Sequence, residues 1–188
     1  MKHLRDASAR RSKIGSMEDQ KKPLEEPHSH LREFKNFLDE LNRETERGAA
    51  LITAAMIDGL LGDCIRSFLI DHSDIRPLLD GFNAPLGTLS ARVLAGFALG
   101  LLSESEYREC QVLRKVRNAF AHDVHVSFGD QNIKDLCSNL TMCAQDYGDV
   151  HVDARGRFTT SATSVILNLT NRPFYAAQRR LVYRRWQY

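Results

Sequence analysis

A chain of 188 residues suits one domain with a tail better than two domains. Apolar residues make up 43% of it, which is enough for a core, and the formal net charge of only +2 excludes a uniformly basic nucleic-acid-binding protein. The cysteines show neither C-x-x-C spacing nor histidines at zinc-ligand spacing. We therefore expect no metal site, no cofactor, and buried free thiols at Cys64, Cys110, Cys137 and Cys143.

The first 28 residues are rich in Arg, Lys, Ser, Glu and Pro and have almost no apolar periodicity, which predicts a disordered tail over 1–28. Both Met1 and Met17 are candidate starts. The polar, charged beginning is not typical of a signal peptide. The longest apolar-rich stretch, 48–62, is interrupted by Asp58 and is too short to cross a bilayer. We expect a cytoplasmic protein without a membrane partner.

The folded domain is expected over 29–188 as an all-α, compact multi-helix bundle. Apolar residues at helical spacing predict a first helix over 31–47, with Ser29 as a plausible N-cap. After Gly48 the alanine- and leucine-rich stretch 49–70 predicts a long helix that is buried on most sides. The next residues, up to Gly87, are punctuated by prolines and glycines, which indicates a loop with one short helical turn.

Another helix is expected from Thr88 or Ser90 to Leu101. A capping box, Ser103-x-x-Glu106, then opens a helix that runs toward His122. Further helices are predicted from Asp130 or Asn132 to about Met142, from about Thr159 to a break near Pro173, and as an arginine- and aromatic-rich helix over about 171–188. The only strand candidate is the short alternation Val124, Val126 and Phe128.

Three stretches carry a family resemblance. They are RETERGAAL at 43–51, PLLDGFNAPLGTLSAR at 77–92 followed by FALGLLSESEYR at 97–108, and VLRKVRNAFAH at 112–122. In order and spacing they resemble the mannitol operon repressor family over roughly residues 30–145. The resemblance implies a compact helical fold, self-association and a role in repressing a sugar-alcohol operon. No exposed helix rich in Arg, Asn and Gln follows a short turn near Gly48, so we expect such a repressor to act through protein partners.

Self-association is also expected from the residues themselves. The stretches 49–70 and 88–101 are apolar around most of their circumference. We expect that one small domain does not bury all of this apolar surface by itself. Asp58 lies in the middle of the first stretch. A lone buried charge is costly, so we expect Asp58 to pair with Arg117 or Arg92, or else to lie at a solvated edge.

The sharpest local signal, Arg117-Asn-Ala-Phe-Ala-His122, resembles the R-x4-H motif of HEPN domains, a helical family that includes metal-independent ribonucleases. Cleavage of RNA through its 2′-hydroxyl needs an acid/base near neutral pH, which His122 could supply. Arg117 could offset charge on the phosphate, and Asn118 could orient the imidazole. The alternative is structural, because basic residues and histidines are favoured at a helix C-terminus.

The C-terminal sequence FYAAQRRLVYRRWQY interleaves aromatic residues with Arg179, Arg180, Arg184 and Arg185. This pattern fits stacking on bases and contact with phosphates of a single-stranded nucleic acid. The alternative is an amphipathic terminal helix with packed aromatics and solvated arginines.

The leading hypothesis is a non-enzymatic bacterial transcriptional regulator that self-associates and binds a protein, RNA or DNA partner. The alternative is a HEPN-type ribonuclease or toxin with Arg117, Asn118 and His122 as catalytic residues. An exposed pair of Arg117 and His122 that face each other in a basic cleft would support the enzyme, whereas a pair covered by the core would support the regulator.

Overall fold

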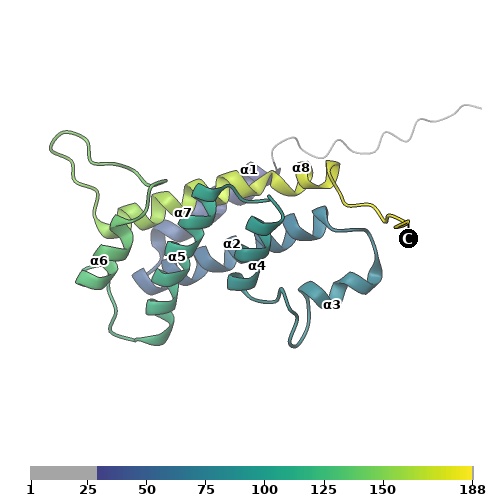
Figure 1. Cartoon of the computed structure of the whole chain (residues 1–188). Helices are drawn as coiled ribbons and strands as arrows, with labels where there is room; N and C mark the ends of the chain where they lie inside the picture. Colours follow the sequence, from purple (N-terminus) through teal and green to yellow (C-terminus); the bar gives the residue numbers. More distant parts are fainter. Residues whose placement is uncertain (1–28, 188) are drawn as a thin grey trace, which may run out of the picture.

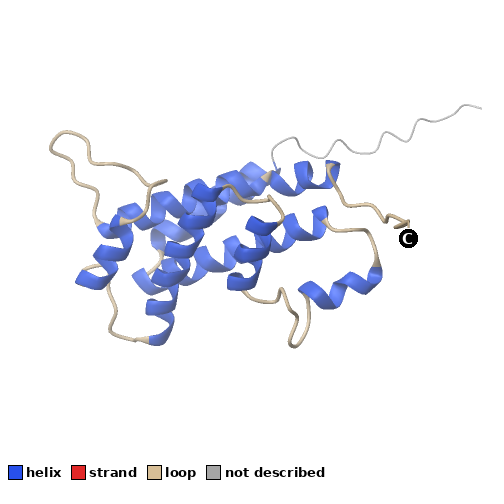
Figure 2. Cartoon of the chain, in the orientation of Figure 1, coloured by secondary structure: helices blue, strands red, loops and turns tan. Residues whose placement is uncertain are grey.

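The computed structural model describes residues 29–187, and the tail predicted over 1–28 lies outside these residues. The described chain is helical, as predicted, and its only strand-like pairing is one isolated bridge between Tyr147 and Val150 (Figure 2). No strand forms around Val126. The elements are α1 Ser29–Arg43, α2 Glu46–Phe68, the 3-10 turn η1 Ser73–Ile75, α3 Arg76–Leu79, α4 Leu89–Ala98, α5 Glu104–His122, α6 Gln131–Ser138, α7 Ala154–Thr170 and α8 Arg172–Gln178.

The boundary between the first two helices differs from the prediction. The chain breaks after Arg43, and the hydroxyl of Thr45 accepts a hydrogen bond from the Gly48 backbone N–H at 3.0 Å. This cap starts α2 at Glu46 and places Gly48 inside the first turn, where the sequence had indicated the break. A capping threonine therefore decides the boundary, and the glycine does not.

Helix α2 runs through the middle of the bundle and packs against α1, α4, α5, α7 and α8 (Figure 1). Its hidden side is built from small and aliphatic residues, as predicted for a mostly buried helix: Ala49, Ala50, Thr53, Ala54, Ile57, Leu61, Gly62, Cys64 and Ile65. By length and composition alone α2 could cross a membrane, but half of its most apolar window is buried inside the protein. Such burial is typical of the core helix of a water-exposed bundle.

All four cysteines are free and buried, as predicted. Burial raises the pKa of three of these thiols, Cys64, Cys110 and Cys137, to about 12. A protonated, buried thiol is a poor nucleophile, so these cysteines act as small apolar core residues.

The corner between α4 and α5 forms from local signals that the sequence carries. Thr88 caps α4 by accepting from the Ala91 N–H at 3.2 Å. Gly100 then adopts a positive φ of 69°, which lets the chain turn back toward the bundle. Ser103 and Glu106 form the predicted capping box, in which the Ser103 N–H donates to the Glu106 carboxylate at 2.8 Å.

In the second half of the chain the helix boundaries differ from the predicted ones. Helix α6 ends at Ser138, four residues before the expected Met142. Helix α7 begins at Ala154, before the expected Thr159, because Asp153 accepts from the Gly156 N–H at 2.7 Å and caps the helix. The helix expected over 171–188 ends at Gln178, and residues 179–187 have no regular secondary structure.

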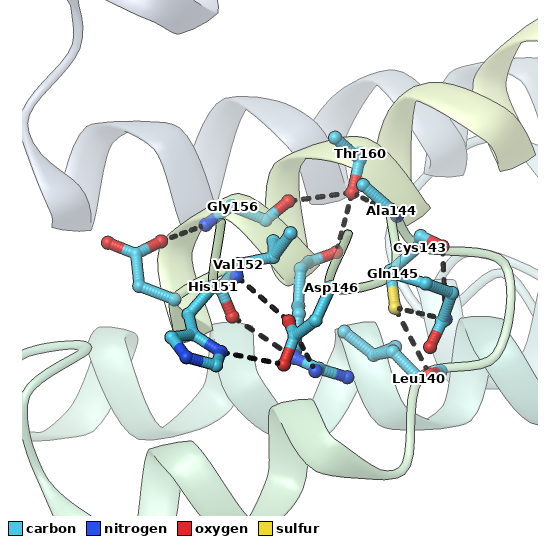
Figure 3. A network of polar contacts seen from close by, with 11 residues as sticks. Leu140, Cys143, Ala144, Gln145, Asp146, His151, Val152, Gly156 and Thr160 are labelled. Atoms are coloured by element: carbon cyan, nitrogen blue, oxygen red, sulfur yellow. Dashed lines mark hydrogen bonds and ion pairs between the residues drawn. The ribbon is translucent and has the colours of Figure 1, made fainter. Parts of the chain in front are cut away.

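A polar network holds the loop that joins α6 to α7 (Figure 3). The Asp146 carboxylate accepts from the Val152 N–H at 2.9 Å and from Arg157 at 3.2 Å, and it lies 3.3 Å from the His151 ring. The Thr160 hydroxyl accepts from the Ala144 N–H at 2.9 Å. The loop is thus fastened to the first turns of α7 at both of its ends.

A buried carboxylate joins α5 to this loop and to α7. Glu109, only 1% exposed, accepts from the N–H and hydroxyl of Thr141, from the Met142 N–H and from the Ser161 hydroxyl, at 2.7 to 3.1 Å. These hydrogen bonds offset the cost of removing the carboxylate from water. No motif in the sequence pointed to Glu109. Its spacing from Leu113, Val116 and Phe120 on the buried face of α5 is the signal that could have found it.

Asp58 forms an ion pair with Arg92, one of its two predicted partners, at 2.8 Å. The same guanidinium donates to the backbone carbonyls of Leu86, Asp58 and Leu79 at 2.8 to 3.1 Å. Arg92 therefore joins α2, the loop before α4, and α4 itself. Gly62 leaves room for it, since a Cβ there would meet the guanidinium at 3.3 Å.

We expect Arg92→Ala to lower the free energy of unfolding by about 3 kcal/mol, because it leaves a partly buried carboxylate and three carbonyls without their donor. Asp58→Asn should cost less, since burial raises the pKa of Asp58 and the charges of Arg92 and Arg117 lower it only in part. Urea unfolding followed by far-ultraviolet circular dichroism measures both changes. Equal effects of the two variants would contradict this account of Arg92 as the junction.

Candidate functional site

The R-x4-H motif lies in the last turns of α5. Arg117 and Asn118 are half-buried and His122 is exposed. Helical geometry persists through His122, and the Asp123 N–H still donates to the Ala119 carbonyl at 3.1 Å. Residues five apart on a helix are turned by roughly 140°, so Arg117 and His122 point to different sides of α5. Within one chain the helix end does not bring this pair together.

Arg117 contributes instead to a hollow of about 380 Å³ between α2, α5 and the start of α4. Its wall contains one carboxylate, Asp58, and otherwise small or apolar residues such as Leu51, Ala55 and Leu89. One oxygen of Asp58 is buried there without a hydrogen-bond partner among the described residues. This hollow holds one acidic and one basic group and does not include His122, so it lacks the charge of a basic cleft.

A second hollow, of about 760 Å³, lies between α8, the end of α2 and the corner that joins α4 to α5. An ion pair is part of its lining: Arg172 donates to both oxygens of Glu106 at 2.7 and 2.8 Å and to the Leu101 carbonyl at 2.9 Å. Phe68, Leu102 and Tyr175 supply apolar walls. This pair, which the sequence analysis did not predict, fastens α8 to the bundle.

The C-terminal segment, residues 179–187, follows α8 and is attached to the end of α2. The Arg180 side chain donates to the Ser67 carbonyl at 3.0 Å, and the Leu181 N–H donates to the Phe68 carbonyl at 2.8 Å. Arg180 also lies 3.0 Å from the Asp71 carboxylate. The segment thus supplies donors and a positive charge to carbonyls that the last turn of α2 leaves free.

The four predicted nucleic-acid-binding arginines therefore fall into two groups. Arg180 is half-buried and engaged with α2. The other three are exposed, and no hydrogen bond or ion pair of their side chains occurs among the described residues: Arg179, Arg184 and Arg185.

The exposed side of α4 carries a stripe of apolar residues. Leu94 is 58% exposed and Phe97 is 39% exposed, and the Phe97 ring stacks on Tyr107 of α5 with ring centroids 4.5 Å apart. Leu94 and Phe97 are three residues apart and share one face of the helix. Helix α4 also packs on α2 and α5, and the Phe97–Tyr107 stack is part of its contact with α5.

A family model described as mannitol repressor matches residues 33–168. The chain belongs to the mannitol repressor family. The match covers α1 to α7 almost completely and extends beyond the resemblance seen in the sequence, whereas α8 and the C-terminal segment lie outside it.

Among solved structures, the chain is similar to the protein in the X-ray structure of the MtlR–HPr complex from Escherichia coli. The two are 21% identical and have a TM-score of 0.56, and the alignment covers 77% of this chain and 99% of that one. At this identity the likeness shows a shared fold. No curated protein matches the chain.

The mannitol repressor family membership gives no support to the ribonuclease hypothesis, which stays a prediction and, by the geometry of α5, needs a second copy to complete its site. If it holds, RNA cleavage should survive a chelator and leave a cyclic phosphate, and DNA should remain intact because it lacks the 2′-hydroxyl. His122→Ala and Arg117→Ala should abolish cleavage, and Asn118→Ala should weaken it less. Cleavage by His122→Ala at the parent rate would assign the activity to a contaminant.

The Glu106–Arg172 pair predicts a pH dependence of stability. Burial raises the pKa of Glu106, but hydrogen bonds from Arg172 and Ser103 and the charge of Arg172 outweigh burial and hold the pKa below its ordinary value of 4.5. A carboxyl with a lowered pKa stabilises the fold above its unfolded-state pKa. That contribution is lost as the pH falls from about 4.5 through the lowered value.

Glu106→Gln should therefore lower the free energy of unfolding by about 2 kcal/mol near neutral pH, and the difference from the parent should shrink in acid. Glu104→Gln is the matched control, because its pair with Arg108 is exposed and should change stability by less than about 0.5 kcal/mol. Urea unfolding at a series of pH values measures both. A constant difference across that series would rule out the lowered pKa.

Proposed function

We propose that this chain is a non-enzymatic cytoplasmic regulator of the mannitol repressor type, and that it acts by binding a protein partner. The observation that carries the proposal is the family match over residues 33–168. The similar Escherichia coli protein was captured in complex with HPr, which supports a protein as the partner and HPr as the first to test.

The exposed face of α4 is the surface that we assign to this partner. The exposed Leu94 and Phe97, the latter stacked on the half-buried Tyr107, form an apolar patch inside the part of the chain that the family match covers. Phe82, on the loop before α4, is 98% exposed and adds a further apolar side chain to this part of the chain. Contiguous apolar groups at the surface of a folded domain are typical of protein interfaces, whose centres are rich in aromatic residues.

We expect Leu94→Asp to weaken HPr binding by at least about tenfold, because it places a charge at the centre of an apolar interface. Leu167→Asp is the matched control, since Leu167 is 45% exposed on α7 and lies away from α4. Isothermal titration calorimetry with HPr of the same organism measures both, and circular dichroism checks the fold.

The outcomes separate the partner from the surface. No binding of HPr by the parent protein would overturn HPr as the partner, and equal binding by the parent and Leu94→Asp would overturn the α4 face.

Light scattering tests whether a second copy of the chain binds to the same face. Self-association was expected through 49–70 or 88–101. Five helices already pack on α2, so α4, which lies in 88–101, is the surface that we propose for it. A parent dimer that Leu94→Asp converts to a monomer would assign this face to self-association.

A further inference from the structure

The C-terminal segment presents a positive charge that the fold does not use. Residues 171–188 contain five arginines and no acidic residue. Two of these arginines have structural partners: Arg172 pairs with Glu106, and Arg180 contacts α2 and Asp71. The remaining three, Arg179, Arg184 and Arg185, are exposed and have no acceptor among the described residues.

The aromatic residues of the segment are also free of the core. Tyr183 is 88% exposed and Trp186 is 78% exposed. An amphipathic terminal helix would pack its aromatic face, but the chain beyond Gln178 is not helical and these rings remain at the surface. Packing in the core therefore does not account for the large aromatic side chains of this segment.

The anchored part of the segment holds these groups in one place. The Leu181 N–H bonds to the end of α2, and the segment folds beside Ile70 around a hollow of about 620 Å³. Arg179, Arg184, Tyr183 and Trp186 all line this hollow. Guanidinium groups and aromatic rings thus share one concave surface at the end of α2, where the chain leaves the bundle in Figure 1.

We propose that the C-terminal segment binds single-stranded nucleic acid. Guanidinium groups of Arg179, Arg184 and Arg185 are suited to bind phosphates, and exposed rings of Tyr183 and Trp186 are suited to stack on unpaired bases. A non-helical segment has no element to place in the major groove of a duplex, so the unpaired strand is favoured. Three arginines that are unpaired among the described residues are fewer than the clusters of about four to eight basic residues that bind anionic membrane surfaces, which favours the nucleic acid.

This inference does not rest on the proposed protein partner, since the segment lies outside the family match and outside the α4 face. A failure to bind HPr would not contradict nucleic-acid binding by the segment, and a failure to bind nucleic acid would not contradict the proposed function.

The test uses the full chain and short fluorescein-labelled oligouridylate and oligothymidylate, with binding followed by fluorescence anisotropy. We expect binding to both strands, with a slope of about −2 for the logarithm of the association constant against the logarithm of salt concentration, because three arginines each release close to 0.7 counterion from a single strand. Trp186 is the only tryptophan, so its intrinsic fluorescence should be quenched as a base stacks on it.

Replacing Arg179, Arg184 and Arg185 together by Ala should weaken binding at least about tenfold and flatten the salt dependence. Tyr183→Ala and Trp186→Ala should each weaken it at least about fivefold. The matched control replaces the exposed Arg43, Arg76 and Arg108 by Ala, which removes the same charge elsewhere and should leave affinity unchanged.

Three results would overturn the proposal. They are no binding by the parent, equal weakening by the control variant, and unquenched Trp186 fluorescence in a bound complex. Vesicles that contain phosphatidylglycerol provide the remaining arm. Binding of the parent to those vesicles without binding to either oligonucleotide would assign the segment to a membrane surface instead.

Discussion

The central constraint in this fold is that α2 must be hidden from water on most of its circumference. No single helix can cover a long apolar helix on several sides, so α1, α4, α5, α7 and α8 surround it. Small residues allow this close approach. A Cβ at Gly96 of α4 would lie 3.4 to 3.5 Å from Leu102 and Leu61, which is already the full van der Waals contact. The remaining helices take their places from this requirement.

Two ion pairs and one buried carboxylate then fix how the covering elements meet. The Arg92–Asp58 pair sets α4 and its preceding loop against α2, the Arg172–Glu106 pair sets α8 against the start of α5, and Glu109 holds the residues after α6 against α7. Apolar contacts alone are non-directional, whereas each of these groups has a small set of acceptable partners. A shift of α4 against α2, or of α7 or α8 against α5, would leave one of these charges without its partner, which costs several kcal/mol.

Two surfaces that remain outside this arrangement are the ones for which we propose binding. The α4 face is apolar and belongs to the part of the chain shared with the mannitol repressor family. The C-terminal segment is basic and aromatic and follows that part. Because Arg180 and Leu181 hold the segment on the end of α2, the core helix positions both surfaces without taking part in either.

The sequence by itself determined the elements whose signals are local. The alanine- and leucine-rich composition of 49–70 predicted α2 as a buried helix. Thr88, one of two candidate starts, and the Ser103–Glu106 capping box located two helix starts, because a cap acts within three residues. Caps that were overlooked, at Thr45 and Asp153, account for the misplaced starts of α2 and α7. Spacing alone also showed that Arg117 and His122 diverge on a continuous helix.

Only the tertiary structure decided which groups meet across long separations. Glu106 finds Arg172, 66 residues later, and Glu109 finds Ser161, 52 residues later. The tertiary structure also decided that Arg180 is structural, that Arg179 and Arg184 have no partner among the described residues, and that Tyr183 and Trp186 are exposed. The physical reason is that a side chain's partner depends on how distant helices pack, and no property of its own neighbourhood in the chain specifies that packing.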